Sequence, residues 1–333
     1  MEASRLFLTP TFNEIICSYL TFEEAIQLRD ALNFDSLKCP ISVFDPKSKK
    51  EIILPGVNLA TLATYELIKK YGLDSVLLKA AENGQNNIVQ TLLKSGINVN
   101  VIDRHGDTAL MLAVQNDYDE VVQTLLTAKD INVNATNRFR KTALRIAVEK
   151  NNNKIVQTLL TAKDIGVTDR FGRTILMFAV AKGRHEIVQT LLTAKNIDVN
   201  AADQEGKTAL IYAVWSNDIK AVQILLTAKD IDVNAPGPFG QTALLLAAKN
   251  KMTDMVKILL TAKDIDVNAT DQNGYTALMW VAKNGQIEMV RALLTIKDIN
   301  VNAINRFGKT ARMMSSGNRR HEIAQILREA GAQ

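Results

Sequence analysis

Apolar residues recur along most of the chain in pairs of short clusters, and each cluster has the spacing of a helix. In one representative segment, Leu210 and Ala213 lie three positions apart, and Val222, Leu225 and Leu226 follow at three- and four-residue spacing. Polar residues that favour turns separate the two clusters, and a longer polar stretch follows them. The pattern predicts two short helices joined by a turn and followed by an extended segment.

This arrangement repeats at nearly constant intervals. A similar segment begins at Ser75, which gives eight units that reach almost to the end of the sequence. One unit cannot bury its apolar stripe alone, so the units are expected to stack on one another. In the other seven units a Thr-Ala-Leu-type triplet marks the start, at intervals of 34 residues with one interval of 32: Thr108, Thr142, Thr174, Thr208, Thr242, Thr276 and Thr310.

Local signals support the two-helix units. The hydroxyl of Thr208 is placed to cap the first helix of its unit. A glycine recurs in the polar segment, but one unit has Arg140 there, for which we expect a left-handed backbone that costs about 1 kcal/mol. Residues that tolerate a left-handed backbone stand between the two helices: Gly84, Asp117, Asn151, Gly183, Asn217 and Gly285. A recurring asparagine is expected to hydrogen-bond the hairpin turn: Asn134, Asn200, Asn234, Asn268 and Asn302.

The units read T-A-L-x-x-A, then I-V-x-x-L-L, then D-V-N-A, and in this they resemble ankyrin repeats over about residues 75–333. The resemblance implies a mainly α fold, an ankyrin-repeat solenoid of helix–turn–helix plus β-hairpin units that binds proteins on its concave face. The chain departs from the family where Ala or Ile175 follows the Thr in place of Pro, and where other residues replace the usual His. That puts the inter-repeat hydrogen bonding of this His in doubt. The family's hydroxylation of the recurring asparagine stays an open possibility.

Two irregular units predict local changes. The 32-residue interval lacks two residues, which predicts a shortened hairpin and a changed stacking angle between the third and fourth units. In the last unit, Arg312 replaces a core leucine and Arg328 replaces the second leucine of the Leu-Leu pair. A terminal repeat has one face in water, so these polar residues indicate a cap.

Residues 1–72 do not repeat, and we interpret them as a small N-terminal α+β cap in front of a repeat domain at 73–333. We expect two short helices within residues 8–32, a β-hairpin at 41–54 that Pro55-Gly56 ends, and a helix at 58–72. Residues 8–32 also resemble an F-box. This alternative implies a Skp-type adapter as a partner and makes the chain a substrate receptor of a cullin–RING ubiquitin ligase. Its adapter-binding residues would be Leu8, Phe12, Ile16, Leu20 and Leu28.

By the family pattern, a partner binds at the hairpin tips and along the inner rim of the first helix. Basic residues outnumber acidic ones at these positions, and arginine stands beside phenylalanine three times. Arginine and aromatic residues are enriched where proteins bind one another, so we expect a protein partner with an acidic surface. The candidate residues are Arg104, His105, Arg138, Phe139, Lys141, Arg170, Phe171, Arg173, Trp215, Phe239, Tyr275, Arg306 and Phe307, with rim lysines Lys150, Lys182, Lys249 and Lys283.

Composition narrows the function further. The net charge of +5 and the lack of a nucleic-acid-binding motif argue against a nucleic-acid partner. The chain has only two cysteines, Cys17 and Cys39, and no secretory signal, which predicts a cytoplasmic location; export into a host cell stays open. It has no long apolar run, so we expect no membrane span. Three dispersed histidines predict no metal site. Phosphate-loop, nucleophile-elbow and metalloprotease motifs are absent, so we expect no catalytic residues and no cofactor.

Overall fold

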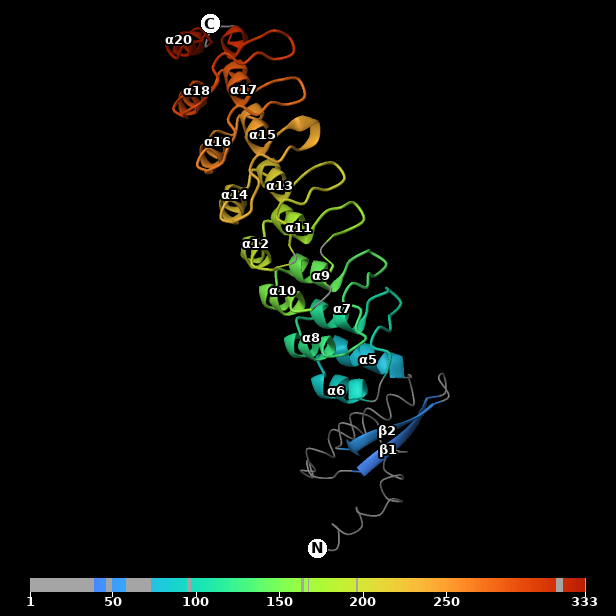
Figure 1. The fold of residues 1–333 in the computed structure, drawn as a ribbon. Helices are drawn as coiled ribbons and strands as arrows, with labels where there is room; N and C mark the ends of the chain where they lie inside the picture. The colour runs from blue at the N-terminus through green and yellow to red at the C-terminus, as the bar shows by residue number, and fades with distance from the viewer. Residues whose placement is uncertain are drawn as a thin grey trace, which may run out of the picture. The chain divides into compact units, whose positions relative to one another are not determined.

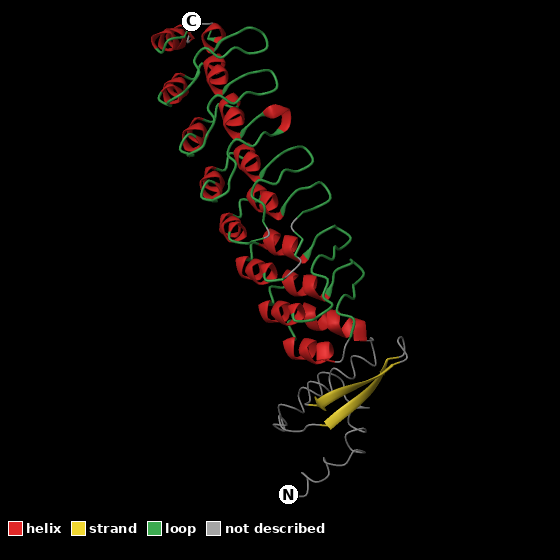
Figure 2. Ribbon diagram, viewed as in Figure 1, coloured by secondary structure: helices red, strands yellow, loops and turns green. Residues whose placement is uncertain are grey.

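The computed structural model describes residues 39–45, 50–57, 73–94, 97–162, 165–166, 168–195, 197–315 and 320–332. The chain divides into two compact units, Met1–Gly166 and Val167–Gln333. The division falls in the interval that is two residues short. Each unit is mainly helical, as expected for an ankyrin-repeat solenoid, and Figures 1 and 2 show its helices in successive pairs with a loop after each pair.

The helix pairs of the two units follow the repeated apolar clusters of the sequence. In the first unit the pairs are α5 (Leu73–Glu82) with α6 (Asn86–Lys94), α7 (Ala109–Gln115) with α8 (Asp119–Leu126), and α9 (Ala143–Lys150) with α10 (Asn153–Leu160). In the second unit they are α11 (Ile175–Ala181) with α12 (His185–Leu192), α13 (Ala209–Trp215) with α14 (Ile219–Leu225), α15 (Ala243–Lys249) with α16 (Thr253–Leu259), α17 (Ala277–Asn284) with α18 (Ile287–Leu294), and α19 (Ala311–Met314) with α20 (Arg320–Glu329).

Stacking of like helices forms the core of each unit. First helices pack on first helices, as α13 does on α11 and α15, and second helices pack on second helices in the same way. In the Leu-Leu pairs the first leucine is fully buried, as Leu225 and Leu259 are, while Leu226 and Leu260 are half-buried. Arg328 stands at the position of the second leucine, beside buried Leu327, and is exposed. The interpretation of the last unit as a cap stays a prediction.

The predicted helix starts and turns are confirmed. The Thr208 hydroxyl accepts a hydrogen bond from the backbone N–H of Ile211, and the first threonines of the other units from Thr108 to Thr310 act in the same way. The predicted turn residues between the helices all have positive φ, and Lys251, which the sequence did not single out, also has a φ of 62°. Arg140 has a φ of 57°.

Replacing Arg140 by glycine is expected to stabilise the fold by about 0.5–1 kcal/mol, because glycine adopts a positive φ without a Cβ clash. Arg140→Ala is the matched control, since it removes the long side chain but keeps the Cβ atom. Denaturant unfolding followed by circular dichroism measures both variants. A gain in the alanine variant equal to that in the glycine variant would show that backbone strain is not the cause.

The predicted N-terminal hairpin is present, but its end differs from the prediction. Strand β1 (Cys39–Asp45) pairs antiparallel with β2 (Lys50–Val57), and the pairing is irregular between Cys39 and Ile41. The strand β2 continues through Pro55-Gly56, so the prediction that this dipeptide ends the hairpin is wrong. The irregular pairing accommodates it, because a bulge tolerates the missing N–H of proline. The helices expected at 8–32 and 58–72 lie outside the described residues, and the boundary at 72–73 stays a prediction.

The recurring asparagines were predicted to hydrogen-bond the hairpin turn. Instead, their side chains link consecutive repeats. The Asn234 Nδ2 donates to the carbonyl of Asp264 at 2.7 Å, and its Oδ1 accepts from the N–H of Asp266 at 2.8 Å. Asn200 and Asn268 make the same pair of bonds one repeat before and after. Repetition of one side chain thus builds an amide ladder along the extended segments, and neighbouring segments are held at a fixed spacing.

Candidate partner-binding face

Each helix pair from α7–α8 onward is preceded by a five-residue turn, which we call a tip turn. The tip turns are residues 103–107, 137–141, 169–173, 203–207, 237–241, 271–275 and 305–309. In six of them an Asp or Asn at the first position closes the turn. For example, Asp203 Oδ1 accepts from the N–H groups of Glu205 and Lys207, both at 2.9 Å. The signal in the sequence is a recurring Asp or Asn five residues before the Thr, and the sequence-based prediction did not include it.

The short interval does not shorten its tip turn. Residues 169–173 close with the same backbone bonds as residues 137–141, from the N–H of Asp169 to the carbonyl of Arg173 at 2.9 Å. The tip turn itself is therefore not shortened. The two missing residues belong to the segment before the turn, because the closing Asp keeps its distance from the Thr. The predicted change of stacking angle stays a prediction.

Neighbouring tip turns are joined through their backbones. The N–H of Arg138 donates to the carbonyl of His105, and within the second unit Gln204 bonds Phe171, Gln272 bonds Phe239, and Arg306 bonds Asn273, at 2.9–3.0 Å. The same link is missing between the turns at 203–207 and 237–241, because the donor position holds Pro238, which has no N–H. In both units the tip turns project on the side of the first helices, away from the second helices (Figure 1). We call the surface of the tip turns and the adjoining side chains of the first helices the tip face.

Four of the predicted aromatic residues stand at the tips and are open to solvent. The exposed fractions of Phe139, Phe239 and Phe307 are 69%, 67% and 64%, and that of Phe171 is 42%. Phe171 is the less exposed one because the guanidinium groups of Arg170 and Arg173 lie 4.4 and 5.0 Å from its ring centroid. These rings are therefore not covered by neighbouring repeats within the described residues.

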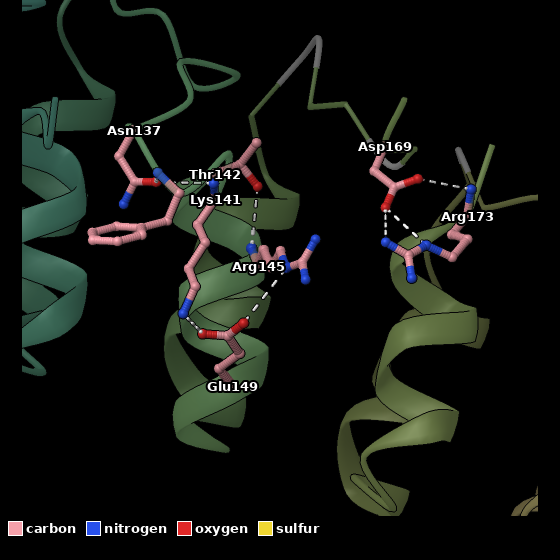
Figure 3. A network of polar contacts seen from close by, with 8 residues as sticks. Asn137, Lys141, Thr142, Arg145, Glu149, Asp169 and Arg173 are labelled. Atoms are coloured by element: carbon pink, nitrogen blue, oxygen red, sulfur yellow. Dashed lines mark hydrogen bonds and ion pairs between the residues drawn. The ribbon is translucent and has the colours of Figure 1, made fainter. Parts of the chain in front are cut away.

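Several predicted basic residues are engaged inside the chain. Lys141 Nζ lies 2.5 Å from Glu149, which also accepts from Arg145, as Figure 3 shows. Arg173 makes two bonds to Asp169, at 2.7 and 3.0 Å. Ion pairs of this kind reduce the charge that a partner meets. Arg104 donates to His105 at 3.0 Å, while Arg138 and Arg306 are exposed without an ion pair among the described residues.

The Asp169–Arg173 pair affects the titration of Asp169. Burial acts to raise the pKa of the carboxyl group. The bonds from the Arg173 side chain and from the N–H groups of Phe171 and Arg173 outweigh burial, so that the pKa lies below its usual value. Asp169 is therefore ionised at neutral pH and keeps its hydrogen bonds to Arg173 and to the backbone of the turn.

Trp215 is exposed to 58% and belongs to a cluster that the sequence analysis found only in part. The Nζ atom of Lys207 lies 3.9 Å from the Trp215 ring centroid and 2.6 Å from Glu205 Oε2. Tyr212, which the analysis missed, donates its hydroxyl to Asp203 at 2.8 Å and lies 5.9 Å from Lys207 Nζ. We call these residues, with Glu205, the Trp215 cluster.

Burial, together with the hydrogen bond to Asp203 and its negative charge, raises the pKa of Tyr212 to about 12. In the unfolded chain the phenol ionises near its ordinary pKa of 10.0. The contribution of protonated Tyr212 to the free energy of unfolding is therefore fully present below pH 10 and is lost as the pH rises towards 12.

Tyr212→Phe should make the free energy of unfolding less dependent on pH between 10 and 12, as measured by denaturant unfolding at several pH values. Tyr118→Phe keeps Tyr212 and should retain the full decline; an equal change in both variants would contradict the assignment.

Lysines and aromatic rings also meet two repeats later, around Trp280, which holds the position that Tyr212 has in its own repeat. Tyr275 stacks on Trp280 with a centroid distance of 4.7 Å and an interplanar angle of 25°. The Nζ atoms of Lys249 and Lys283 lie 5.3 and 4.8 Å from the Trp280 centroid. Phe307 meets the edge of Tyr275 at 6.3 Å. We call these five residues the Trp280 cluster. Trp280 itself was missed, because it stands four positions after its Thr, whereas Trp215 and the predicted rim lysines stand seven or eight positions after theirs.

Other predicted features fall outside what the structure tests. The adapter-binding residues Leu8, Phe12, Ile16, Leu20 and Leu28 lie outside the described residues, so the F-box remains a prediction. Within the described ranges, no three His, Cys, Asp or Glu side chains gather as they would around a metal ion. In the same part of the chain, no helix has the length and apolar character needed to cross a membrane.

Comparison with known proteins decides the family. A model of ankyrin repeats matches three times, at residues 59–137, 144–237 and 244–333. The chain belongs to the ankyrin-repeat family. Ankyrin repeats generally mediate protein–protein interaction, and ankyrin-repeat proteins are typically non-enzymatic scaffolds.

One solved structure similar to this ankyrin-repeat chain is the ankyrin repeat domain of Bcl-3, described as a unique member of the IkappaB protein family. The two are 25% identical, with a TM-score of 0.46, over 76% of this chain and 97% of that one. Comparison with curated proteins gave no match.

Proposed function

We propose that this ankyrin-repeat protein is a non-enzymatic scaffold that binds a partner protein on the tip face. The single observation that carries the proposal is that aromatic side chains of the tip face are exposed in each of the two units. Phe139, Phe239, Phe307 and Trp215 each expose more than half of their surface. Large exposed apolar groups near basic residues are typical of surfaces that another protein covers.

The charges of the tip face favour an acidic partner surface. Arg138 and Arg306 are exposed beside Phe139 and Phe307. Arginine combines a bidentate donor with a planar group that stacks on rings, so an Arg–Phe pair can bind a carboxylate and an apolar side chain together. The basic residues with internal ion pairs contribute less, because their charge is already balanced.

Charge reversal of Arg138 and Arg170 tests the proposal. The full chain and its Arg138→Glu, Arg170→Glu variant are used to capture proteins from a eukaryotic cell extract, and captured proteins are quantified by mass spectrometry. The control, Lys129→Glu with Lys195→Glu, makes the same change of charge at exposed positions after α8 and α12. Partners of the tip face should fall about tenfold or more with the arginine variant and stay unchanged with the lysine control.

Equal recovery of every specific partner by the wild type and the arginine variant would contradict an acidic ligand at these arginines. Equal loss in both variants would indicate that overall charge, rather than the tip face, determines capture. Circular dichroism of both variants verifies that the helices remain folded.

A further inference from the structure

The Trp280 cluster brings two lysines to one indole ring without a carboxylate between them. A ring face attracts one ammonium group, but two ammonium groups at the same ring repel each other. Neither Lys249 nor Lys283 forms an ion pair within the part of the chain that the structure describes. Within the described residues, the charge of these two exposed ammonium groups is therefore not balanced by a carboxylate.

The carboxylate that contacts Trp280 is committed to its turn. Asp271 is 6% exposed, and its Oδ2 accepts from the indole N–H of Trp280 at 3.3 Å. Its Oδ1 accepts from the N–H groups of Asn273 and Tyr275 at 2.9 and 3.0 Å. Asp271 thus fixes the orientation of the indole ring and does not serve as the partner of the lysines.

The Trp215 cluster shows how such a lysine is satisfied when an acid is present. There Lys207 lies over the indole ring, and its ammonium group also pairs with Glu205 in the third position of the tip turn. The third position of the turn before α17 is Asn273, which carries no charge. The Trp280 cluster therefore has the lysines and the indole ring but lacks the acid.

We propose that the Trp280 cluster binds a glutamate or aspartate side chain of an acidic peptide segment in the partner protein. The carboxylate pairs with Lys249 and Lys283, and the neighbouring part of the segment packs on the exposed ring of Phe307. The inference rests on the proposed function and names the chemistry that one part of the tip face recognises. A partner carboxylate balances the charge of Lys249 and Lys283 as Glu205 balances that of Lys207 in the Trp215 cluster.

Hexaglutamate is the probe, and hexaglutamine is its neutral control. Binding of the labelled peptides to the full chain is measured by fluorescence anisotropy. The test variant is Lys249→Glu with Lys283→Glu. The matched control is Lys263→Glu with Lys297→Glu, which makes the same charge change in the same two repeats at exposed positions after α16 and α18. Hexaglutamate affinity should fall about tenfold or more in the test variant and less than about twofold in the control.

A second readout locates the peptide. Trp215 and Trp280 are the two tryptophans of the chain, so Trp215→Phe leaves the emission of Trp280 alone. Hexaglutamate should shift or quench this emission at the same concentration that saturates the anisotropy. Hexaglutamine should do neither.

Three results would overturn the proposal: no binding of hexaglutamate to the wild type, equal binding of hexaglutamine, or equal loss of affinity in the test and control variants. If the test variant loses its helical circular dichroism, Lys249→Gln with Lys283→Gln replaces it, and unchanged affinity there would also overturn the proposal. The peptide titration does not depend on capture from extract. Failure here alongside partner loss in the Arg138, Arg170 variant refutes this site alone, whereas unchanged capture by that variant refutes the proposed function.

Discussion

Leu259→Ala is expected to lower the free energy of unfolding by about 2–5 kcal/mol, because it empties a fully buried position between stacked second helices. Leu259 ends α16 with 0% of its surface exposed, and α16 packs on both α14 and α18. A cavity there weakens the packing of its own repeat and of both neighbours. Urea unfolding followed by far-ultraviolet circular dichroism measures the loss as a lower midpoint.

The adjacent Leu260 provides the control within the same Leu-Leu pair. It is half-buried, so Leu260→Ala should cost only about 1 kcal/mol for the smaller apolar area that it covers. Equal losses at the two leucines would contradict the burial pattern, and with it the interpretation of Arg328 as a tolerated substitution at the second position.

Asn234→Ala is expected to destabilise the chain by about 1–3 kcal/mol, because it breaks two hydrogen bonds that connect consecutive repeats. The N–H of Asp266 loses its acceptor, and the carbonyl of Asp264 loses its donor. Hydrogen exchange should show faster exchange at the Asp266 amide, and urea unfolding should show a lower midpoint.

Asn250→Ala is the control for the ladder. Asn250 is exposed and donates one bond, to the carbonyl of Leu246 in its own helix. Its loss should be smaller, and the Asp266 amide should exchange as in the wild type. A loss as large as that at Asn234 would indicate that the link between repeats adds nothing beyond an ordinary surface hydrogen bond.

The regular part of the fold could be predicted because the same local sequence features recur in each repeat. The threonine caps, the left-handed turn residues and the buried leucines are local features, and they recur often enough to be read without any structure. Even the strained backbone of Arg140 followed from its alignment with the glycines of other repeats. The amide ladder could not be predicted in this way, because Asn234 bonds residues 30 and 32 positions further along.

The sequence predicted which residues lie on the candidate site, but it did not predict the ion pairs and ring contacts that join them. The exposure of Phe139 and Phe307 follows from their place at the tips of turns. However, the sequence does not show that Lys141 pairs with Glu149, since the two are eight residues apart and meet through the geometry of a turn and a helix. Trp280 stands outside the positions that the family pattern singles out, and the sequence does not show that Lys249 of the preceding repeat lies beside its ring.

Pro238 divides the row of tip turns in the second unit. Before it, the turn that carries Phe171 is bonded to the turn of the Trp215 cluster; after it, the turns that carry Phe239, Tyr275 and Phe307 are bonded in series. The spacing between the Trp215 and Trp280 clusters is therefore set by helix packing without a continuous chain of tip hydrogen bonds. A long acidic ligand that reaches both tryptophans would cross the position of Pro238, where no backbone hydrogen bond joins the two tip turns. We expect the distance between the two clusters to adjust there to the spacing of the charges on the ligand.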